Sequence, residues 1–202
     1  MAGIRKLVAA GVELGIKTNG MTLNKGEVIA IKAFAQGLPK TFFKFDAAIM
    51  PRRDHDRSPT ELRLKPKEIF DLYRQDRQMS DQIASECASM PMQAPAERKM
   101  FNCSAATSRF HISAWGDLHP CHTVRQVRLS LLNMSFSDAA LALHKHIDSL
   151  TYPKESPCGT CKIFAQCDSC PGLAFLEGKA ESVPASYHCD VAHETVARFT
   201  NG

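Results

Sequence analysis

The chain has 202 residues, with 25 basic and 21 acidic side chains and a formal net charge of +4. This small and scattered excess of positive charge does not indicate a nucleic-acid-binding surface. No segment approaches the roughly 18–20 uninterrupted apolar residues that cross a bilayer, and the N-terminus lacks the pattern of a secretory signal. We therefore expect a cytoplasmic protein that associates with neither nucleic acid nor membrane.

The first 75 residues are predicted to alternate between helix and strand, from the spacing of their apolar residues and from their turn signals. Asn24 is expected to cap the second helix, with Glu27 completing a capping box. The predicted elements, in chain order, are a helix over 4–12, a strand over 16–21, a helix from 24 to about 36, a strand over 41–50 and a helix over 65–73.

This alternation is typical of a parallel α/β sheet. A complete (β/α)₈ barrel takes eight βα units, whereas only two are predicted here, and two strands do not bury a sheet on their own. The predicted fold class is therefore α/β (α+β), in which residues 1–75 are the C-terminal βα units of a partial TIM-type barrel.

The remaining residues predict a linker and a second, smaller domain. Residues 76–100 are polar and are expected to be the linker, and residues 101–202 are expected to form a cysteine-rich domain of a β-hairpin and helices. The hairpin is predicted from its turn residues over 109–121, with its turn at Gly116 and Asp117. Helices are expected over 137–150 and 191–199.

The eight cysteines are distributed unevenly, since none precedes Cys87. In a reducing compartment, clustered cysteines more often bind metal or do chemistry than form disulfides. The spacing is Cys103-x₁₂-Gly116-x₄-Cys121, then Cys158-x₂-Cys161-x₅-Cys167-x₂-Cys170, and finally Cys189.

Three interpretations of the cysteines compete: disulfides, a Cys₄ zinc site and iron–sulfur clusters. Zinc sites built from two Cys-x₂-Cys pairs usually separate the pairs by about 15–20 residues, whereas only five separate these. Zinc would also leave Cys103, Cys121 and Cys189 without a role. Thiolates are the ligands of iron–sulfur clusters, and two cubane clusters would use nearly every thiol.

The gapped seven-cysteine pattern resembles the SPASM domain, which ends many radical S-adenosylmethionine enzymes, including peptide maturases and anaerobic sulfatase maturases. The resemblance spans residues 101–199 and extends to Gly116-Asp-Leu-His-Pro-Cys121 and Cys170-Pro-Gly-Leu-Ala. It implies two auxiliary [4Fe-4S] clusters. The implied ligands are Cys103, Cys121 and Cys170 for the first cluster, and Cys158, Cys161, Cys167 and Cys189 for the second.

Two details depart from the family's common pattern. Two residues separate Cys167 from Cys170 where three are usual, and the first cluster is one ligand short. Cys87 could supply that ligand, or the site could stay open, or a histidine could take it; the candidate histidines are His111, His119 and His122.

The segments 15–24 and 42–49 resemble the last two strands of a radical S-adenosylmethionine barrel. The family's Cys-x₃-Cys-x₂-Cys loop is missing, so the cluster that binds S-adenosylmethionine cannot form in this chain. The resemblance implies the iron–sulfur portion of an enzyme that modifies a peptide or protein, either a truncated radical enzyme or one half of a split one. S-adenosylmethionine and its cluster would then bind only if an N-terminal radical half is supplied. The alternatives are a free-standing electron-transfer or peptide-binding module and a structural zinc domain.

Overall fold

The structure, a computed structural model, describes residues 1–89, 96–167 and 169–199. The chain divides into two compact units, each of which mixes helix and strand. We call residues 1–52 with 56–86 the N-unit, and residues 53–55 with 87–202 the C-unit.

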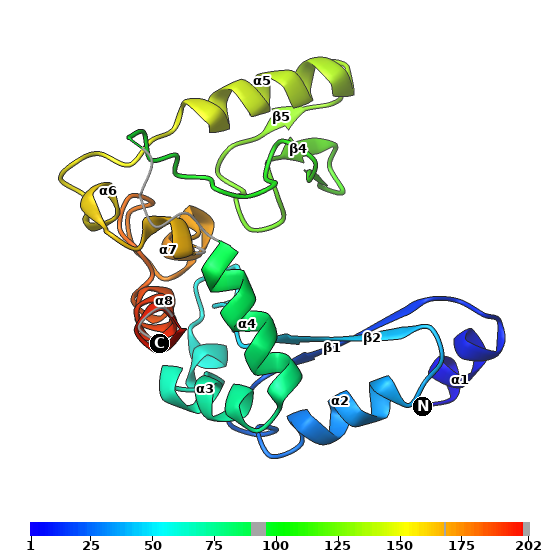
Figure 1. Cartoon of the computed structure of the whole chain (residues 1–202). Helices are drawn as coiled ribbons and strands as arrows, with labels where there is room; N and C mark the ends of the chain where they lie inside the picture. The colour runs from blue at the N-terminus through cyan, green and yellow to red at the C-terminus, as the bar shows by residue number, and fades with distance from the viewer. Residues whose placement is uncertain (90–95, 168, 200–202) are drawn as a thin grey trace. The chain divides into compact units, whose positions relative to one another are not determined.

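The N-unit is built on two parallel strands and the helix that connects them (Figure 1). β1 and β2 pair in register from Leu14 opposite Thr41 to Asn19 opposite Asp46. The expected strand–helix–strand order is confirmed. The elements are α1 Ala2–Ala9, β1 Leu14–Asn19, α2 Val28–Gln36, β2 Thr41–Asp46, the 3₁₀ turn η1 Ser58–Leu62, α3 Pro66–Arg74 and α4 Arg77–Ser89.

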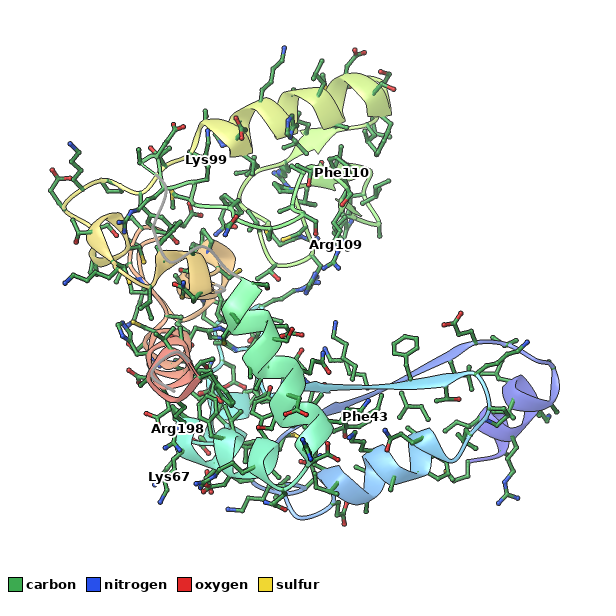
Figure 2. All side chains as sticks on the ribbon, in the orientation of Figure 1. Phe43, Lys67, Lys99, Arg109, Phe110 and Arg198 are labelled. Carbon is green, nitrogen blue, oxygen red and sulfur yellow. The ribbon has the colours of Figure 1, made fainter. Side chains whose placement is uncertain are left out.

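Burial alternates along both strands, as expected where one face of a sheet is covered. Phe43, labelled in Figure 2, and Phe45 lie on the half-buried face of β2. The helix α2 packs against both strands of the β1–β2 pair. On the other face the ring of Phe42 is 54% exposed beside Gly15, where an added Cβ would lie 2.7 Å from it. The parallel pair therefore keeps one exposed, partly apolar face.

The predicted capping box at Asn24 is wrong. The helix begins later, at Val28, and its N-cap residue Glu27 makes no side-chain cap. Asn24 instead closes the preceding turn: its Oδ1 accepts from the backbone N–H of Met21 at 2.8 Å, and its Nδ2 donates to the carbonyl of Asn19 at 3.0 Å. Asparagine side chains bond to nearby backbone groups in turns as readily as at helix ends, and here the turn prevails.

Within the expected linker over 76–100, residues 77–89 form the helix α4. Asp76 starts this helix by accepting a hydrogen bond from the backbone N–H of Met79 at 2.9 Å. Met79 and Cys87 are buried on an otherwise polar helix. Composition alone therefore could not distinguish this mostly polar helix from a loop. Residues 90–95 of the expected linker lie outside the described residues.

Asp76 also forms the most buried ion pair described in the N-unit. Its Oδ1 lies 2.5 Å from Lys32 Nζ, and the two side chains are 19% and 7% exposed, respectively. The hydrogen bond from Lys32 is the main cause that lowers the pKa of Asp76. Lys32 projects from α2, so the pair fixes α2 to the start of α4.

We expect Asp76→Asn to lower the free energy of unfolding of the N-unit by about 2 kcal/mol at neutral pH. This is below the ~3–5 kcal/mol for breaking a fully buried pair, because asparagine can still accept the hydrogen bond. A carboxyl group with a lowered folded pKa stabilises above its unfolded pKa, about 3.9, and stops doing so as pH falls through the folded pKa. The difference from wild type should thus hold at pH 5–8 and shrink below about pH 4.

Denaturant unfolding followed by circular dichroism at pH 7 and pH 3 measures both effects. Asp71→Asn is the matched control, since Asp71 pairs with Arg74 at the surface and should contribute at most about 1 kcal/mol. Equal losses in the two variants would contradict a special role for the buried pair.

The C-unit contains a three-stranded antiparallel sheet in the order β3-β4-β5 and five further elements. The predicted hairpin is confirmed, with shorter strands, and Gly116 adopts a φ of +79° in its turn. The third strand was not predicted, and the last helix begins five residues earlier than expected. The elements are β3 His111–Ile112, β4 Asp117–His119, β5 Leu129–Ser130, α5 Phe136–Ser149, α6 Pro157–Thr160, the 3₁₀ turn η2 Phe164–Gln166, α7 Pro171–Leu176 and α8 Ser186–Phe199.

A small core joins α5 to the sheet (Figure 1). Leu118 of β4 is fully buried against Leu143 and neighbouring residues of α5, and Phe110 packs at its edge, 5.6 Å edge-to-face from Phe136 (Figure 2). Trp115, which precedes Gly116 in the hairpin turn, is 77% exposed. Among the described residues, no helix has the length and apolar character needed to cross a membrane.

Candidate metal centre

The loop that carries Cys103 is held beside the strand that leads to Cys121. The backbone N–H of Ala106 donates to the carbonyls of both Pro120 and Arg109, each at 3.0 Å. Ala106 has a φ of +54°, unusual for a residue with a Cβ, and is 1% exposed. The tight turn after Cys103 is therefore fixed against the residue that precedes Cys121.

A close approach of two backbone segments brings Cys170 towards Cys121. Gly172 lies in the first turn of α7, and a Cβ there would lie 2.9 Å from Val124 Cγ2 and 3.0 Å from Thr123 Cγ2. The backbone N–H of Val124 donates to Cys121 Sγ at 3.4 Å. Glycine at 172 thus allows α7, which begins directly after Cys170, to pack on the turn that follows Cys121.

The Cys158–Cys161 loop is held by contacts from outside it. Ser156 caps α6 by accepting from the backbone N–H of Cys158 at 3.2 Å. Arg98 Nη1 donates to the carbonyls of Cys158 and Cys161 at 2.8 and 2.7 Å. The Arg98 guanidinium lies 5.4 Å from the centre of the Phe164 ring, in cation–π geometry.

Gly159 lies within this loop and touches the preceding backbone. A Cβ at this position would lie 2.0 Å from the carbonyl oxygen of Pro153 and 3.0 Å from the Cα of Lys154. Real Cβ atoms do not approach backbone this closely. The loop between the two cysteines consequently requires glycine for steric reasons.

The electrostatics of the thiols separate them into two sets. Burial raises the pKa of Cys170, and the nearby thiolates of Cys121 and Cys103 raise it further, against backbone N–H groups that lower it. We call Cys103, Cys121 and Cys170 the first set.

The second set is Cys158, Cys161, Cys167 and Cys189. Burial, with smaller contributions from Cys158, Cys189 and Cys161, raises the pKa of Cys167 to about 12. Burial also raises the pKa of Cys158 and of Cys189, and Cys161 contributes to both. The thiols that raise the pKa of Cys158, Cys167 and Cys189 are therefore members of the same set.

Tyr152 adjoins both sets. Burial and the charges of Cys158, Cys167 and Cys170 together raise its pKa to about 12, while a hydrogen bond with Ser169 opposes the shift. Its hydroxyl lies 3.1 Å from Ser169 Oγ, and its ring packs edge-to-face on Phe164 at 5.9 Å. A neutral phenol thus lies near members of both sets.

All eight cysteines are free thiols, and all eight lie in the described part of the chain. Among the described residues, no three or more His, Cys, Asp or Glu side chains are close enough together to hold one metal ion. Cys87, on α4, is 3% exposed and belongs to neither set. The arrangement is one of two neighbourhoods of thiols rather than a preformed mononuclear site.

The candidate histidines lie on and after the hairpin. His111 and His119 are cross-strand partners with ring centres 5.9 Å apart, and His122 is exposed beyond Cys121. His119 is 3% exposed, and its Nδ1 lies 3.1 Å from the carbonyl of Val127. A carbonyl only accepts, so Nδ1 carries the proton and Nε2 is directed elsewhere.

Sequence reasoning missed the supporting residues Arg98, Gly159 and Tyr152. The glycine between two cysteines was a signal that could have been used, because glycine there suggests close approach of backbone. Arg98 and Tyr152 carry no local signal, since their partners lie up to 63 residues away along the chain.

Comparison of the chain with protein-family models, with curated proteins and with solved structures finds no match.

Proposed function

We propose that the C-unit binds two [4Fe-4S] clusters, one on each set of thiols. The observation that carries the proposal is the packing that joins the segments of Cys103, Cys121 and Cys170: Ala106 bonds to Pro120, and Gly172 lies against Thr123 and Val124. The influence of Cys121 and Cys103 on the pKa of Cys170, and of Cys158, Cys189 and Cys161 on that of Cys167, follows the same two sets that the family resemblance implies.

The donor chemistry fits such clusters. Thiolates are the usual ligands of iron–sulfur clusters, and hydrogen bonds to sulfur adjust cluster potentials. Backbone N–H groups reach the sulfurs of Cys121, Cys167 and Cys170. Burial and mutual repulsion oppose thiolate formation in the metal-free chain, and iron would compensate both, since a coordinated thiol is deprotonated.

The first set needs a fourth ligand or leaves one iron open. Cys87 is buried near the end of α4, and His119 keeps Nε2 available because Nδ1 is bonded to backbone. An Nδ1–H to carbonyl bond of this kind is what usually orients a metal-binding histidine. Both residues stay candidates for the position.

The clusters would serve as the auxiliary clusters of a radical S-adenosylmethionine enzyme of the SPASM type, supporting electron transfer and substrate binding during modification of a peptide or protein. The parallel β1–β2 pair of the N-unit, with α2 packed on it, supports an origin in the last βα units of that barrel. No cysteine precedes Cys87, so S-adenosylmethionine and its own cluster would be bound by residues other than these 202.

Two other functions follow from the same thiols. A free-standing electron-transfer or peptide-binding module would use both clusters without the radical step. A structural zinc domain would use four thiols of the second set, with Zn–S distances of about 2.3 Å. Metal content distinguishes the zinc domain from the two functions that use iron–sulfur clusters. A partner that supplies the radical cluster would then distinguish the portion of a radical enzyme from a free-standing module.

Anaerobic reconstitution of the full chain, followed by assay of iron, labile sulfide and zinc, tests the proposal. We expect about eight irons and eight sulfides per chain, with broad absorption near ~400 nm, the composition of two cubane clusters. About one zinc per chain, with no sulfide and no colour, would show a zinc domain instead.

Single substitutions should then remove one cluster at a time. Cys189→Ser is expected to lose about four irons through the second set, Cys121→Ser about four through the first, and the double variant all of them. Loss of all iron in either single variant would contradict two independent sets. The same assay on Cys87→Ser decides whether Cys87 completes the first set.

A further inference from the structure

Positively charged and imidazole side chains gather on the face of the hairpin that carries His111 and His119. The charges of Arg125, Arg53 and His122 all lower the pKa of His111, and the charge of Arg125 also lowers the pKa of His119. All these residues belong to the C-unit. The group is therefore local to one folded unit.

Two acidic side chains near His119 and Arg125 have other partners among the described residues. Asp117, the acidic side chain that acts on His119, already pairs with Arg128 at 3.3 Å. Glu181 accepts a hydrogen bond from Gln126 at 3.2 Å. The neighbouring acids are thus engaged with other partners.

Arg125 provides the most specific observation. Its Nη1 is buried and has no hydrogen-bond partner among the described residues. An unpaired buried donor costs about 1–3 kcal/mol, and more when it is charged, so such groups usually have a partner in the working protein. His119, 3% exposed and oriented by the carbonyl of Val127, adds a second donor or acceptor at Nε2.

We propose that this group, with Arg125 as its central residue, is a binding site for an anionic oxygen group, a carboxylate or a phosphate. The guanidinium offers paired N–H donors that match either group, and the imidazoles add further hydrogen bonds. The proposal does not depend on the iron–sulfur clusters, although an acidic side chain of a peptide substrate would be one source of the carboxylate.

Titration calorimetry of the reconstituted full chain with sodium phosphate, and separately with sodium acetate, tests the site. Low ionic strength is needed, because exposed charges are screened beyond about 10 Å at 0.1 M salt. We expect phosphate, or phosphate and acetate, to bind wild type, and Arg125→Gln to weaken binding at least tenfold. Arg125→Lys, which keeps the charge without the planar fork, should lie between them.

Arg128→Gln is the matched control, since Arg128 lies three residues away and already pairs with Asp117. Its anion affinity should equal that of wild type. Binding of phosphate alone assigns the site to a phosphate group, and binding of both anions extends it to carboxylates. The proposal is overturned if neither anion binds, or if Arg125→Gln and Arg128→Gln lose affinity equally. Iron content, measured on the same samples, reports separately on the clusters.

Discussion

Gly159→Ala is expected to abolish metal binding by the second set while the N-unit stays folded. The new methyl group would lie 2.0 Å from the carbonyl oxygen of Pro153, and its three nearest atoms are all backbone, so no side chain can move aside. Overpacking of this kind costs ~3 kcal/mol. Because Cys158 and Cys161 flank the glycine, relief of the clash must move at least one of them.

Iron and sulfide assay after reconstitution measures the effect. Wild type should hold about eight irons and the variant about four, those of the first set. Thr160→Ala is the matched control, because it changes the other residue between the same two cysteines without adding volume. A full iron content in Gly159→Ala would show that the loop tolerates displacement and that its geometry does not govern binding.

Arg98→Met is expected to have the next largest effect. The side chain donates from a charged group to the carbonyls of both Cys158 and Cys161, and hydrogen bonds of this kind contribute about 1.5–3 kcal/mol each. Methionine preserves much of the packing on Phe164 but leaves both carbonyls without this donor. We expect a loss of about 3 kcal/mol in the unfolding free energy of the C-unit, together with slower or incomplete loading of the second set.

Chemical unfolding and the kinetics of iron incorporation measure the two parts of this effect. Lys162→Met is the matched control, because Lys162 directly follows Cys161 and is exposed, so its loss should change the unfolding free energy by at most about 0.5 kcal/mol. If Arg98→Met matched this control in both measurements, the two hydrogen bonds would have no role in shaping the loop.

Elements with strong local signals could be predicted from the sequence. The parallel pair, the hairpin with Gly116 at its turn, and a helix over 137–150 all follow from periodicity and turn chemistry. The assignment of the cysteines to two sets came from the resemblance to the SPASM domain. The partial barrel and the identity of the metal stay predictions.

The errors arose where a competing local hydrogen bond or a tertiary contact overrides the preference that the sequence pattern indicates. Asn24 had the sequence context of a helix cap, but its side chain closes a turn against Asn19 and Met21. Residues 77–89 lacked a strong apolar pattern, yet Asp76 caps them and Lys32 fixes that cap from another helix. Two-residue strands such as β5 form only because β4 lies alongside, so no local signal precedes them.

Trp115 is the chain's single tryptophan, and it stands 77% exposed at the tip of the hairpin. Its indole is already in contact with water in the folded protein, so its fluorescence emission should change little when the chain unfolds. The same emission should shift towards the blue when another molecule covers the hairpin tip and removes that water. The folded chain thus carries a built-in optical probe for encounters at one defined point on its surface.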